Sequence, residues 1–385
     1  MEELNTTTPR IFIAATRQDD GKTTTSLGLL HAFRSQLPNI GYIKPVGQRY
    51  VDIEGKQIDE DSVLINETYQ VKLPLEAMSP IAVGPNFTRD YMQSGNSSML
   101  EDKVVAAFNR TAWEQNFVII EGTGHAGVGS VFDLSNARVA SVLQSKAIII
   151  SQGGLGKPID EIALNLALFD KFNVEVIGVI LNKCIPQKIE QLWHFAEKGL
   201  GKMGLPLLGV VPLNYELRKP TVNQVCKELN ATFVAGERYK RRRVSRVVIG
   251  TASSRHAQMY FEPGTLIITA GDRDDLILAV LSAFQSGKEA PIAGVVLTHE
   301  FAVDPGLLEL MKERQVPFMS VPYDSYTVAS KINQMTVKTE VGDLEKIDMI
   351  QGMIRQNVNI EKIIQLASPS GPPKKKGDMP ENSAF

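Results

Sequence analysis

Short apolar runs rich in β-branched residues alternate with amphipathic segments along most of this 385-residue chain. The runs are almost continuously apolar, as in strands that are buried on both faces of a parallel sheet. This alternation predicts an α/β fold with a doubly wound, mostly parallel sheet. In the first part of the chain the expected strands are 11–15, 40–43, 117–121, 146–151, 174–181 and 207–211, and the expected helices are 22–36, 99–115, 136–144, 158–171 and 187–203.

The pattern restarts after about residue 230, following a basic cluster at 238–246 (RYKRRRVSR). A second, smaller α/β domain is therefore expected, in which Asp324 and Asp343 are placed to cap helices. The segment 70–98, rich in proline and glycine, is expected to be irregular. The expected divisions of the chain are a first domain over 10–230, a second over 238–360 and a disordered polar tail over 368–385. The fragment 1–230 is expected to fold alone.

Composition restricts the partners and the compartment. A formal net charge of -2 argues against electrostatic attraction to nucleic acid or to an anionic membrane. The two cysteines, Cys184 and Cys226, are too few for a disulfide framework and fit a reducing compartment. The N-terminus lacks the apolar core of a signal peptide, and no apolar run approaches the ~18 residues of a membrane span. A cytoplasmic protein is expected.

The first expected strand leads into a phosphate-binding pattern, IFIAATRQDDGKTTTSLGLL (residues 11–30). Gly21, Lys22, Thr23 and Thr24 follow a strand and open a helix. In this context backbone N–H groups point at a phosphate, a lysine faces its terminal oxygens and a hydroxyl binds Mg²⁺. The first glycine of G-x-x-x-x-G-K-[ST] is missing, because Thr16 stands in its place. A side chain at that point restricts the turn.

Other polar residues follow the ends of expected strands. Lys44 ends the strand in GYIKPVGQ, and Glu121 ends the strand in FVIIEGTGHAG. Carboxyl ends of parallel strands form the ligand crevice of such folds, where a carboxylate such as Glu121 is a typical Mg²⁺ ligand. Asp61 is a second candidate for the metal. Asn182, in GVILNKC, could read the edge of a base.

Together these motifs carry a resemblance. The order GKTT, YIKPV, D, IIEGTGHAG, GVILNK and LPLLGVVP over residues 10–215 resembles the dethiobiotin synthetase family of P-loop proteins. The later segments FVAGERYKRRRVSRVVIGTAS, PGTLIITAGDRDDLILAVLSA and IAGVVLTHE resemble the DRTGG-type domain. The pair, in this order, is similar to the N-terminal region of long bacterial phosphate acetyltransferases.

The resemblance implies a role for each matching residue. Lys22 would be the phosphate lysine, Thr23 would supply the Mg²⁺ hydroxyl, and Lys44 would lie beside the phosphates and the substrate. The Mg²⁺ carboxylates would be Asp61 and Glu121. The base would be bound by Asn182 and the stretch around Pro212. ATP and Mg²⁺ are the implied cofactors, although Asn182 is compatible with either ATP or GTP.

The sequence also departs from these families. Arg17 stands where the synthetases have an acidic residue ahead of the loop, so metal and substrate handling are expected to differ. It also lies five residues before Lys22, where related face-to-face dimeric ATPases carry a lysine that reaches the partner's nucleotide. A catalytic Arg17 in a homodimer or higher oligomer is one reading; an Arg17 that faces solvent, or that neutralises Asp19 and Asp20 within its own loop, is the other. The Thr-Gly-Gly of the DRTGG-type domain reads Thr298-His299-Glu300.

Three functions remain open. The first is an ATP-binding regulatory protein, with or without weak ATP hydrolysis, that controls a metabolic enzyme partner. The second is an ATP-dependent ligase or carboxylase-like enzyme that activates a small carboxylate. The third is a scaffold whose phosphate loop is vestigial. Acetyl transfer by this chain alone is not expected, because the catalytic domain of the acetyltransferases lies beyond the DRTGG-type domain.

Overall fold

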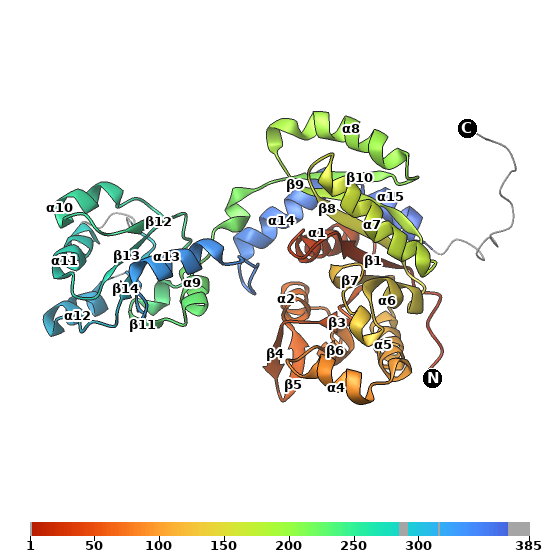
Figure 1. Ribbon diagram of the computed structural model, residues 1–385, viewed down its shortest axis with the longest axis horizontal. Coiled ribbons are helices and arrows are strands. Elements are labelled where there is room, and N and C mark those ends of the chain that lie inside the picture. The colour runs from red at the N-terminus through yellow and green to blue at the C-terminus, as the bar shows by residue number, and fades with distance from the viewer. Residues whose placement is uncertain (1, 285–291, 315, 369–385) are drawn as a thin grey trace, which may run out of the picture. The chain divides into compact units, whose positions relative to one another are not determined.

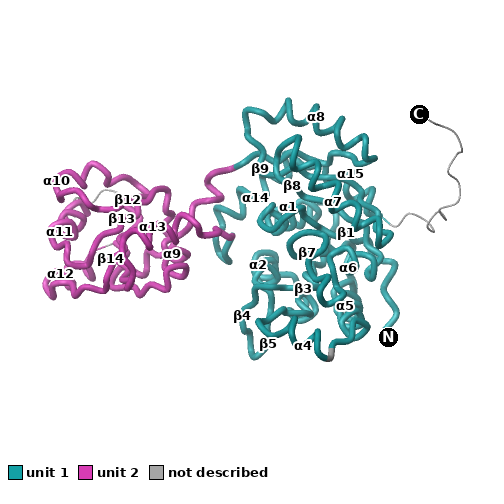
Figure 2. Tube along the Cα trace, viewed as in Figure 1, with its two compact units in different colours: residues 1–213, 339–385 teal, residues 214–338 magenta. Residues whose placement is uncertain are grey.

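The computed structural model describes residues 2–284, 292–314 and 316–368. The chain forms two compact units (Figure 2). Unit 1 contains residues 1–213 and 339–385, and unit 2 contains residues 214–338. Unit 2 is therefore inserted in the sequence of unit 1. Apart from Ser368, the predicted tail 368–385 lies outside the described residues.

Unit 1 is built on a six-stranded sheet in the order β10-β9-β8-β1-β7-β2, and all of its strand pairs are parallel (Figure 1). This confirms the predicted doubly wound α/β fold. Each apolar run of the sequence became a strand, with bounds close to those expected. The strands are β1 (Arg10–Ala15), β2 (Ile40–Ile43), β7 (Phe117–His125), β8 (Lys146–Gln152), β9 (Val176–Cys184) and β10 (Leu207–Pro212).

Helices connect these strands, as parallel pairing requires. The main ones are α1 (Lys22–Arg34), α5 (Ser97–Ala112), α6 (Asn136–Val142), α7 (Lys157–Lys171) and α8 (Ile189–Gly201). Between β2 and α5 the chain makes a small subdomain. It consists of β3 (Val46–Gly47), β4 (Tyr50–Ile53), β5 (Lys56–Asp59), α2 (Glu60–Tyr69), α3 (Leu75–Met78), β6 (Ile81–Ala82) and α4 (Phe87–Ser94). Segment 70–98 is thus more regular than expected: Pro74 precedes α3, and β6 pairs with β3.

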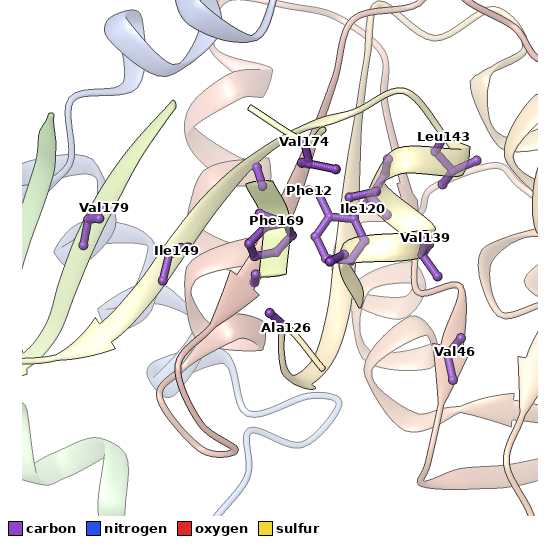
Figure 3. Packing of buried hydrophobic residues seen from close by; sticks show 14 of the residues in the cluster. Phe12, Val46, Ile120, Ala126, Val139, Leu143, Ile149, Phe169, Val174 and Val179 are labelled. Carbon is purple, nitrogen blue, oxygen red and sulfur yellow. The ribbon is translucent and has the colours of Figure 1, made fainter. Parts of the chain in front are cut away.

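The core of unit 1 lies between the central sheet and its helices. One cluster of buried residues joins side chains of the strands to side chains of α5, α6, α7 and α8. Figure 3 shows part of this cluster, including Phe12 of β1, Ile120 of β7 and Phe169 of α7. Phe12 and Phe169 are fully buried. Packing of this kind fixes the positions of the strand ends, where the polar residues of interest lie.

The structure corrects the expected domain boundaries of 10–230 and 238–360. After unit 2 the chain returns to unit 1 as α14 (Leu344–Asn357) and α15 (Ile360–Ala367). Helix α14 packs on α1 so closely that a Cβ on Gly28 would lie 2.3 Å from the Ile354 side chain. Val358 then forms an antiparallel bridge with Gly209 of β10. The expected helix 343–356 exists, but it is part of the core of unit 1.

Unit 2 has a five-stranded sheet in the order β11-β15-β14-β13-β12, which is parallel except for the pair of β11 with β15. The predicted caps are present: Asp324 of unit 2 accepts from the backbone N–H groups of Tyr326 and Thr327, and Asp343, which belongs to unit 1, accepts from that of Lys346. The strands are β11 (Thr232–Ala235), β12 (Arg246–Ile249), β13 (Thr265–Ala270), β14 (Gly294–Thr298) and β15 (Phe318–Ser320), and the helices are α9 (Val222–Leu229), α10 (Ser254–Ala257), α11 (Asp274–Ala283), α12 (Pro305–Glu313) and α13 (Ser325–Gln334).

Helices of membrane-crossing length and apolarity are absent from the part of the chain that the structure describes.

Candidate functional site

The phosphate-loop pattern lies between the end of β1 at Ala15 and the start of α1 at Lys22. Gly21 caps the helix with φ of 102°, a left-handed conformation that favours glycine. A Cβ at Gly21 would also lie 2.2 Å from Nδ2 of Asn182. The loop therefore needs glycine here for both its conformation and the space, and α1 can present its N-terminal N–H groups toward an anion.

Side chains brace the part of the loop where the first glycine is missing. Thr16 donates from Oγ1 to Oδ2 of Asp20 at 2.7 Å, and its Oγ1 lies 3.0 Å from Oγ of Ser151 on β8. The same carboxylate oxygen accepts from the backbone N–H of Arg17 at 2.8 Å. Asp20 is fully buried. The residue that replaces glycine thus contributes a hydroxyl to a closed loop.

Lys22 is the lysine of the pattern, and 9% of its surface is exposed. Its ammonium donates to the carbonyl oxygen of Arg17 over a long 3.4 Å. Burial lowers the pKa of Lys22, and the charge of Lys44 lowers it further, while Glu121, Asp20 and Asp61 act in the opposite direction. An anionic ligand at the loop would compensate this buried charge.

Glu121, within the buried part of β7, lies beside the start of α1. Its Oε1 accepts from the hydroxyl of Thr23 at 2.8 Å, and its Oε2 accepts from the hydroxyl of Tyr42 at 3.0 Å. Burial raises the pKa of the Glu121 carboxyl, against the lowering effect of Lys44. The two predicted metal ligands Thr23 and Glu121 are therefore in direct contact.

Lys44 lies among carboxylates. Its ammonium forms ion pairs with Asp61, with Oδ1 of Asp59 at 3.1 Å and with Oε1 of Glu121 at 3.9 Å. Burial by itself would lower the pKa of Lys44, but the charges of Asp61, Asp59 and Glu121 outweigh burial and raise it. Lys44 is consequently held as a cation in the interior of unit 1.

Asn182, predicted to read a base, is engaged with the loop itself. Its Nδ2 donates to the carbonyl oxygen of Asp20 at 2.8 Å, and its Oδ1 accepts from the backbone N–H of Lys183 at 2.8 Å. Lys183 in turn donates to the carbonyl oxygen of Asp19. The structure thus gives Asn182 a part in holding the loop. Pro212 ends the neighbouring strand β10, and base recognition by Asn182 and Pro212 stays a prediction.

Arg17 forms an ion pair that neither sequence-based reading contained. Its Nε donates to Oε2 of Glu161 on α7 at 2.7 Å, and Nη2 donates to Oε1 of the same carboxylate. The two bonds form the bidentate geometry typical of an arginine and a carboxylate. The hydrogen bond to Glu161 is the main reason why the pKa of Arg17 is raised. Within its own protomer Arg17 is thus turned to α7.

The donor set at the site can be tested against a divalent cation. Mg²⁺ is commonly held by one or two carboxylates together with phosphate oxygens and water. Within 2–284, 292–314 and 316–368, no three His, Cys, Asp or Glu side chains are arranged to hold a metal by themselves. Around the phosphate loop the buried groups are, however, out of balance, with four carboxyls and two ammonium groups: Asp20, Asp59, Asp61 and Glu121 against Lys22 and Lys44. Hydroxyl and carboxylate oxygens with surplus negative charge fit Mg²⁺ bound together with a nucleotide.

Sequence reasoning missed Tyr42, Asp59 and Glu161 in this neighbourhood, and it considered Asp20 only as a partner of Arg17. Asp20 directly precedes Gly21 and Asp59 lies two residues before Asp61, so the consecutive acids in RQDDGK and IDEDS were an available signal. Tyr42 lies two residues before Lys44 and points to the same region. Glu161 is far from Arg17 in sequence and nothing local indicates their contact.

A phosphate loop at the carboxyl edge of a parallel sheet, with a lysine, a threonine and an acidic strand end, defines the class of P-loop proteins. Comparison with known families agrees: the family described as an AAA domain matches residues 9–221. That match covers more than half of the chain, and the protein belongs to this AAA domain family. The DRTGG domain matches residues 224–335.

Curated relatives include phosphate acetyltransferases. The one from Pseudomonas aeruginosa is 27% identical over 371 residues, covering 92% of this chain and 51% of that protein. The one from Nitrosomonas europaea is 26% identical, with coverage of 92% and 51%. The chain thus spans about half the length of the curated relatives it matches. It resembles their N-terminal region, which confirms the resemblance read from the sequence.

Solved structures with a similar arrangement include the MinC:MinD cell division complex of Aquifex aeolicus. That chain is 13% identical, with a TM-score of 0.36, and the match covers 54% of this chain and 83% of that one. The CBS and DRTGG domains of the regulatory region of Clostridium perfringens pyrophosphatase, complexed with diadenosine tetraphosphate, match with 17% identity and a TM-score of 0.26. That match covers 34% of this chain and 59% of that one.

Proposed function

We propose that unit 1 binds ATP together with Mg²⁺, and that the protein is a nucleotide-sensing regulator of a metabolic partner. The observation that carries the proposal is the contact of the Thr23 hydroxyl with Glu121, directly beside Lys22 at the start of α1. A nucleotide phosphate and a metal need these three groups together. Lys22, Thr23 and Glu121 are all present and lie together, which argues against a vestigial site.

Each residue has a role in this proposal. Lys22 and the N–H groups at the start of α1 bind the terminal phosphates. Thr23 and Glu121 hold Mg²⁺. Asp61 pairs with the same Lys44 ammonium as Glu121, so it is near enough to take part. The metal supplies charge neutralisation of the phosphates. Asn182 fixes the loop through the Asp20 carbonyl group. Asp20 itself closes the loop at the position without glycine.

The regulatory part of the proposal rests on connectivity. Unit 2, which the DRTGG domain family matches, leaves unit 1 after β10 and returns to it before α14. Helix α14 packs on α1, the helix that begins at the end of the phosphate loop. A change in unit 2 that displaces α14 would therefore reach the loop through α1. This gives a physical route by which nucleotide binding and the state of unit 2 bias each other.

The test is nucleotide turnover and binding measured on the full chain. Calorimetry should show ATP binding that depends on Mg²⁺. Little ADP should be released, and small carboxylic acids should not change its rate. If a panel of such acids accelerates ADP release, the chain is an ATP-dependent ligase rather than a regulator. Absence of ATP binding with and without Mg²⁺ would contradict both.

A further inference from the structure

The most unusual group near the phosphate loop is the ammonium of Lys44. It is buried, and its partners Asp59, Asp61 and Glu121 come from three separate segments: the end of β5, the first turn of α2 and β7. Two of these partners, Asp61 and Glu121, are the carboxylates predicted for Mg²⁺. A positive charge from the chain therefore lies between groups that a metal would use.

We propose that Lys44 is an internal counter-ion that keeps the metal-binding carboxylates satisfied until nucleotide arrives. The inference rests on the proposed function and adds an order of events to it. Mg²⁺ binds weakly to the free protein because it competes with the Lys44 ammonium for Asp61 and Glu121. A nucleotide phosphate gives Lys44 another anionic partner beside Asp59 and so releases Asp61 and Glu121.

Asp59 is the residue that allows this exchange. It is 1% exposed, and its position is fixed from three directions. Its Oδ1 accepts from the N–H of Asp61, its own N–H donates to Oγ of Ser79 at 2.9 Å, and a Cβ added at Gly47 would lie 2.6 Å from its Oδ2. Oδ2 of Asp59 has no hydrogen-bond partner among the described residues. Asp59 can therefore keep hold of Lys44 when the other two carboxylates change partner.

Hydrogen bonding at Glu121 supports the same assignment of roles, in which Asp59 holds Lys44 while Glu121 is free to change partner. Thr23 and Tyr42 each donate to one oxygen of Glu121, whereas Lys44 lies 3.9 Å from it. Glu121 thus keeps its orientation without Lys44. Asp59 binds Lys44 more closely, at 3.1 Å. We assign Asp59 and Tyr42 as positioning residues, Asp59 for the ammonium and Tyr42 for the carboxylate that faces Thr23.

The experiment measures Mn²⁺ binding to the full chain by electron paramagnetic resonance, without nucleotide. Lys44→Met removes the competing charge and should bind Mn²⁺ at least ten times more tightly than the wild type. The matched control is Lys56→Met, which removes an exposed lysine paired with Glu76 in the same subdomain. The control should bind Mn²⁺ as the wild type does. In the wild type, adding ATP should raise the Mn²⁺ affinity by a similar factor, since the linkage is reciprocal.

A second variant covers the case in which Lys44→Met does not fold. Lys44→Met combined with Asp59→Asn removes one charge of each sign and keeps Asp61 and Glu121. It should fold and also bind Mn²⁺ at least ten times more tightly than the wild type. A folded variant that binds Mn²⁺ no more tightly than the wild type overturns the inference. So does a wild type that binds Mn²⁺ as tightly without nucleotide as with ATP. If calorimetry shows ATP binding to the wild type, only the counter-ion role has failed; if it shows none, the proposed function has failed.

Discussion

The two units end their parallel strands in different ways. At the sheet edge of unit 1, the buried Lys44 ammonium pairs with three buried carboxylates, those of Asp59, Asp61 and Glu121. At the corresponding edge of unit 2, the Arg273 guanidinium is satisfied by the carbonyl oxygens of Gly250 and Ala252 and by Asp275. The same architectural edge thus carries surplus buried charge in one unit and a closed set of contacts in the other. Surplus charge is what a charged ligand can relieve.

The loops at the two edges also differ in which residues adopt a left-handed backbone. His299 and Glu300 follow β14 and have φ of 67° and 51°, where the family pattern has glycines. Two consecutive side chains in the left-handed region are costly, at about 1–2 kcal/mol for each residue. In the loop of unit 1 the left-handed cap is a glycine, Gly21. Unit 1 thus keeps a glycine at the helix cap, although Asp19 of the same loop is left-handed with φ of 64°, whereas unit 2 keeps the conformation without the glycines.

The largest expected effect concerns the boundary between the units. Fragment 1–230, expected from sequence to fold alone, lacks α14 and α15, whose Ile347, Ile350, Ile354 and Ile363 are at most 3% exposed. Burial of one such side chain contributes about 1.5–3 kcal/mol, so losing them all approaches the ~5–15 kcal/mol stability of a typical protein. The fragment should be unfolded or aggregated by circular dichroism and size-exclusion chromatography.

The control is residues 1–213 joined to 339–368 by a flexible linker. It should fold and retain nucleotide binding, and residues 214–338 should fold separately. A soluble, cooperatively folded 1–230 fragment would show that α14 and α15 are dispensable.

Next comes the contrast between the two edges. Lys44→Met leaves buried carboxylates without their cation and should cost about 3–5 kcal/mol of unfolding free energy in metal-free buffer. Arg273→Met removes hydrogen bonds at a more exposed site and should cost about 1–2 kcal/mol. Chemical denaturation of the full chain, and of unit 2 by itself, measures both losses of unfolding free energy. Equal losses of unfolding free energy in the two variants would mean that the buried charges at the edge of unit 1 contribute no more to stability than the contacts of Arg273 in unit 2.

A pH series sharpens the same contrast. The pKa of Glu121 is raised, mainly by burial, above its value in the unfolded chain. Such a carboxyl favours folding below its unfolded pKa of about 4.3, and this contribution is lost as the pH rises through the folded pKa. Glu121→Gln should therefore melt at a higher temperature than the wild type at pH 8 without metal. The advantage should vanish near pH 4, and a constant difference at all pH values would refute the assignment.

The smallest effect on stability is expected at Arg17. Its ion pair with Glu161 is partly exposed, so Arg17→Ala should change the unfolding free energy by less than about 1 kcal/mol. In a face-to-face homodimer Arg17 would exchange Glu161 for the partner's phosphates. The variant should then bind ATP almost normally and lose both hydrolysis and the ATP-driven dimer in sedimentation velocity. Glu161→Gln, which frees Arg17, should retain the dimer, and wild-type hydrolysis by Arg17→Ala would exclude this role.

Much of unit 1 was predictable because each of its strands can be recognised from a short stretch of sequence. The continuous apolar runs gave the six strands, and parallel pairing then placed Lys44, Glu121 and the loop at one edge. Asp61, in the first turn of α2, was assigned to the metal through the resemblance to the synthetase family and not through the strand pattern. The hairpin of β4 and β5 was missed, although Glu54-Gly55, both left-handed, is a two-residue turn between alternating segments. That signal was in the sequence.

Other features depend on contacts between distant segments and have no local signature. The amphipathic pattern of α14 predicts a helix but does not say which unit covers its apolar face, and the helix was therefore placed in the wrong domain. The pair of Arg17 with Glu161 joins residues 144 positions apart. The role of Asn182 in holding the loop likewise appears only when β9 lies beside the Asp20 carbonyl group.

The central claim, that the edge of unit 1 is a nucleotide site, is tested most directly by calorimetric titration of MgATP into three proteins. These are the wild type, Lys22→Ala and the control Lys171→Ala, which changes an exposed lysine at the end of α7. Lys22→Ala should lose about 1.5–3 kcal/mol of binding free energy, or about 10- to 150-fold in affinity, because a charge-assisted bond to phosphate is removed. The control should match the wild type. Equal ATP affinity in Lys22→Ala and the wild type would contradict the account.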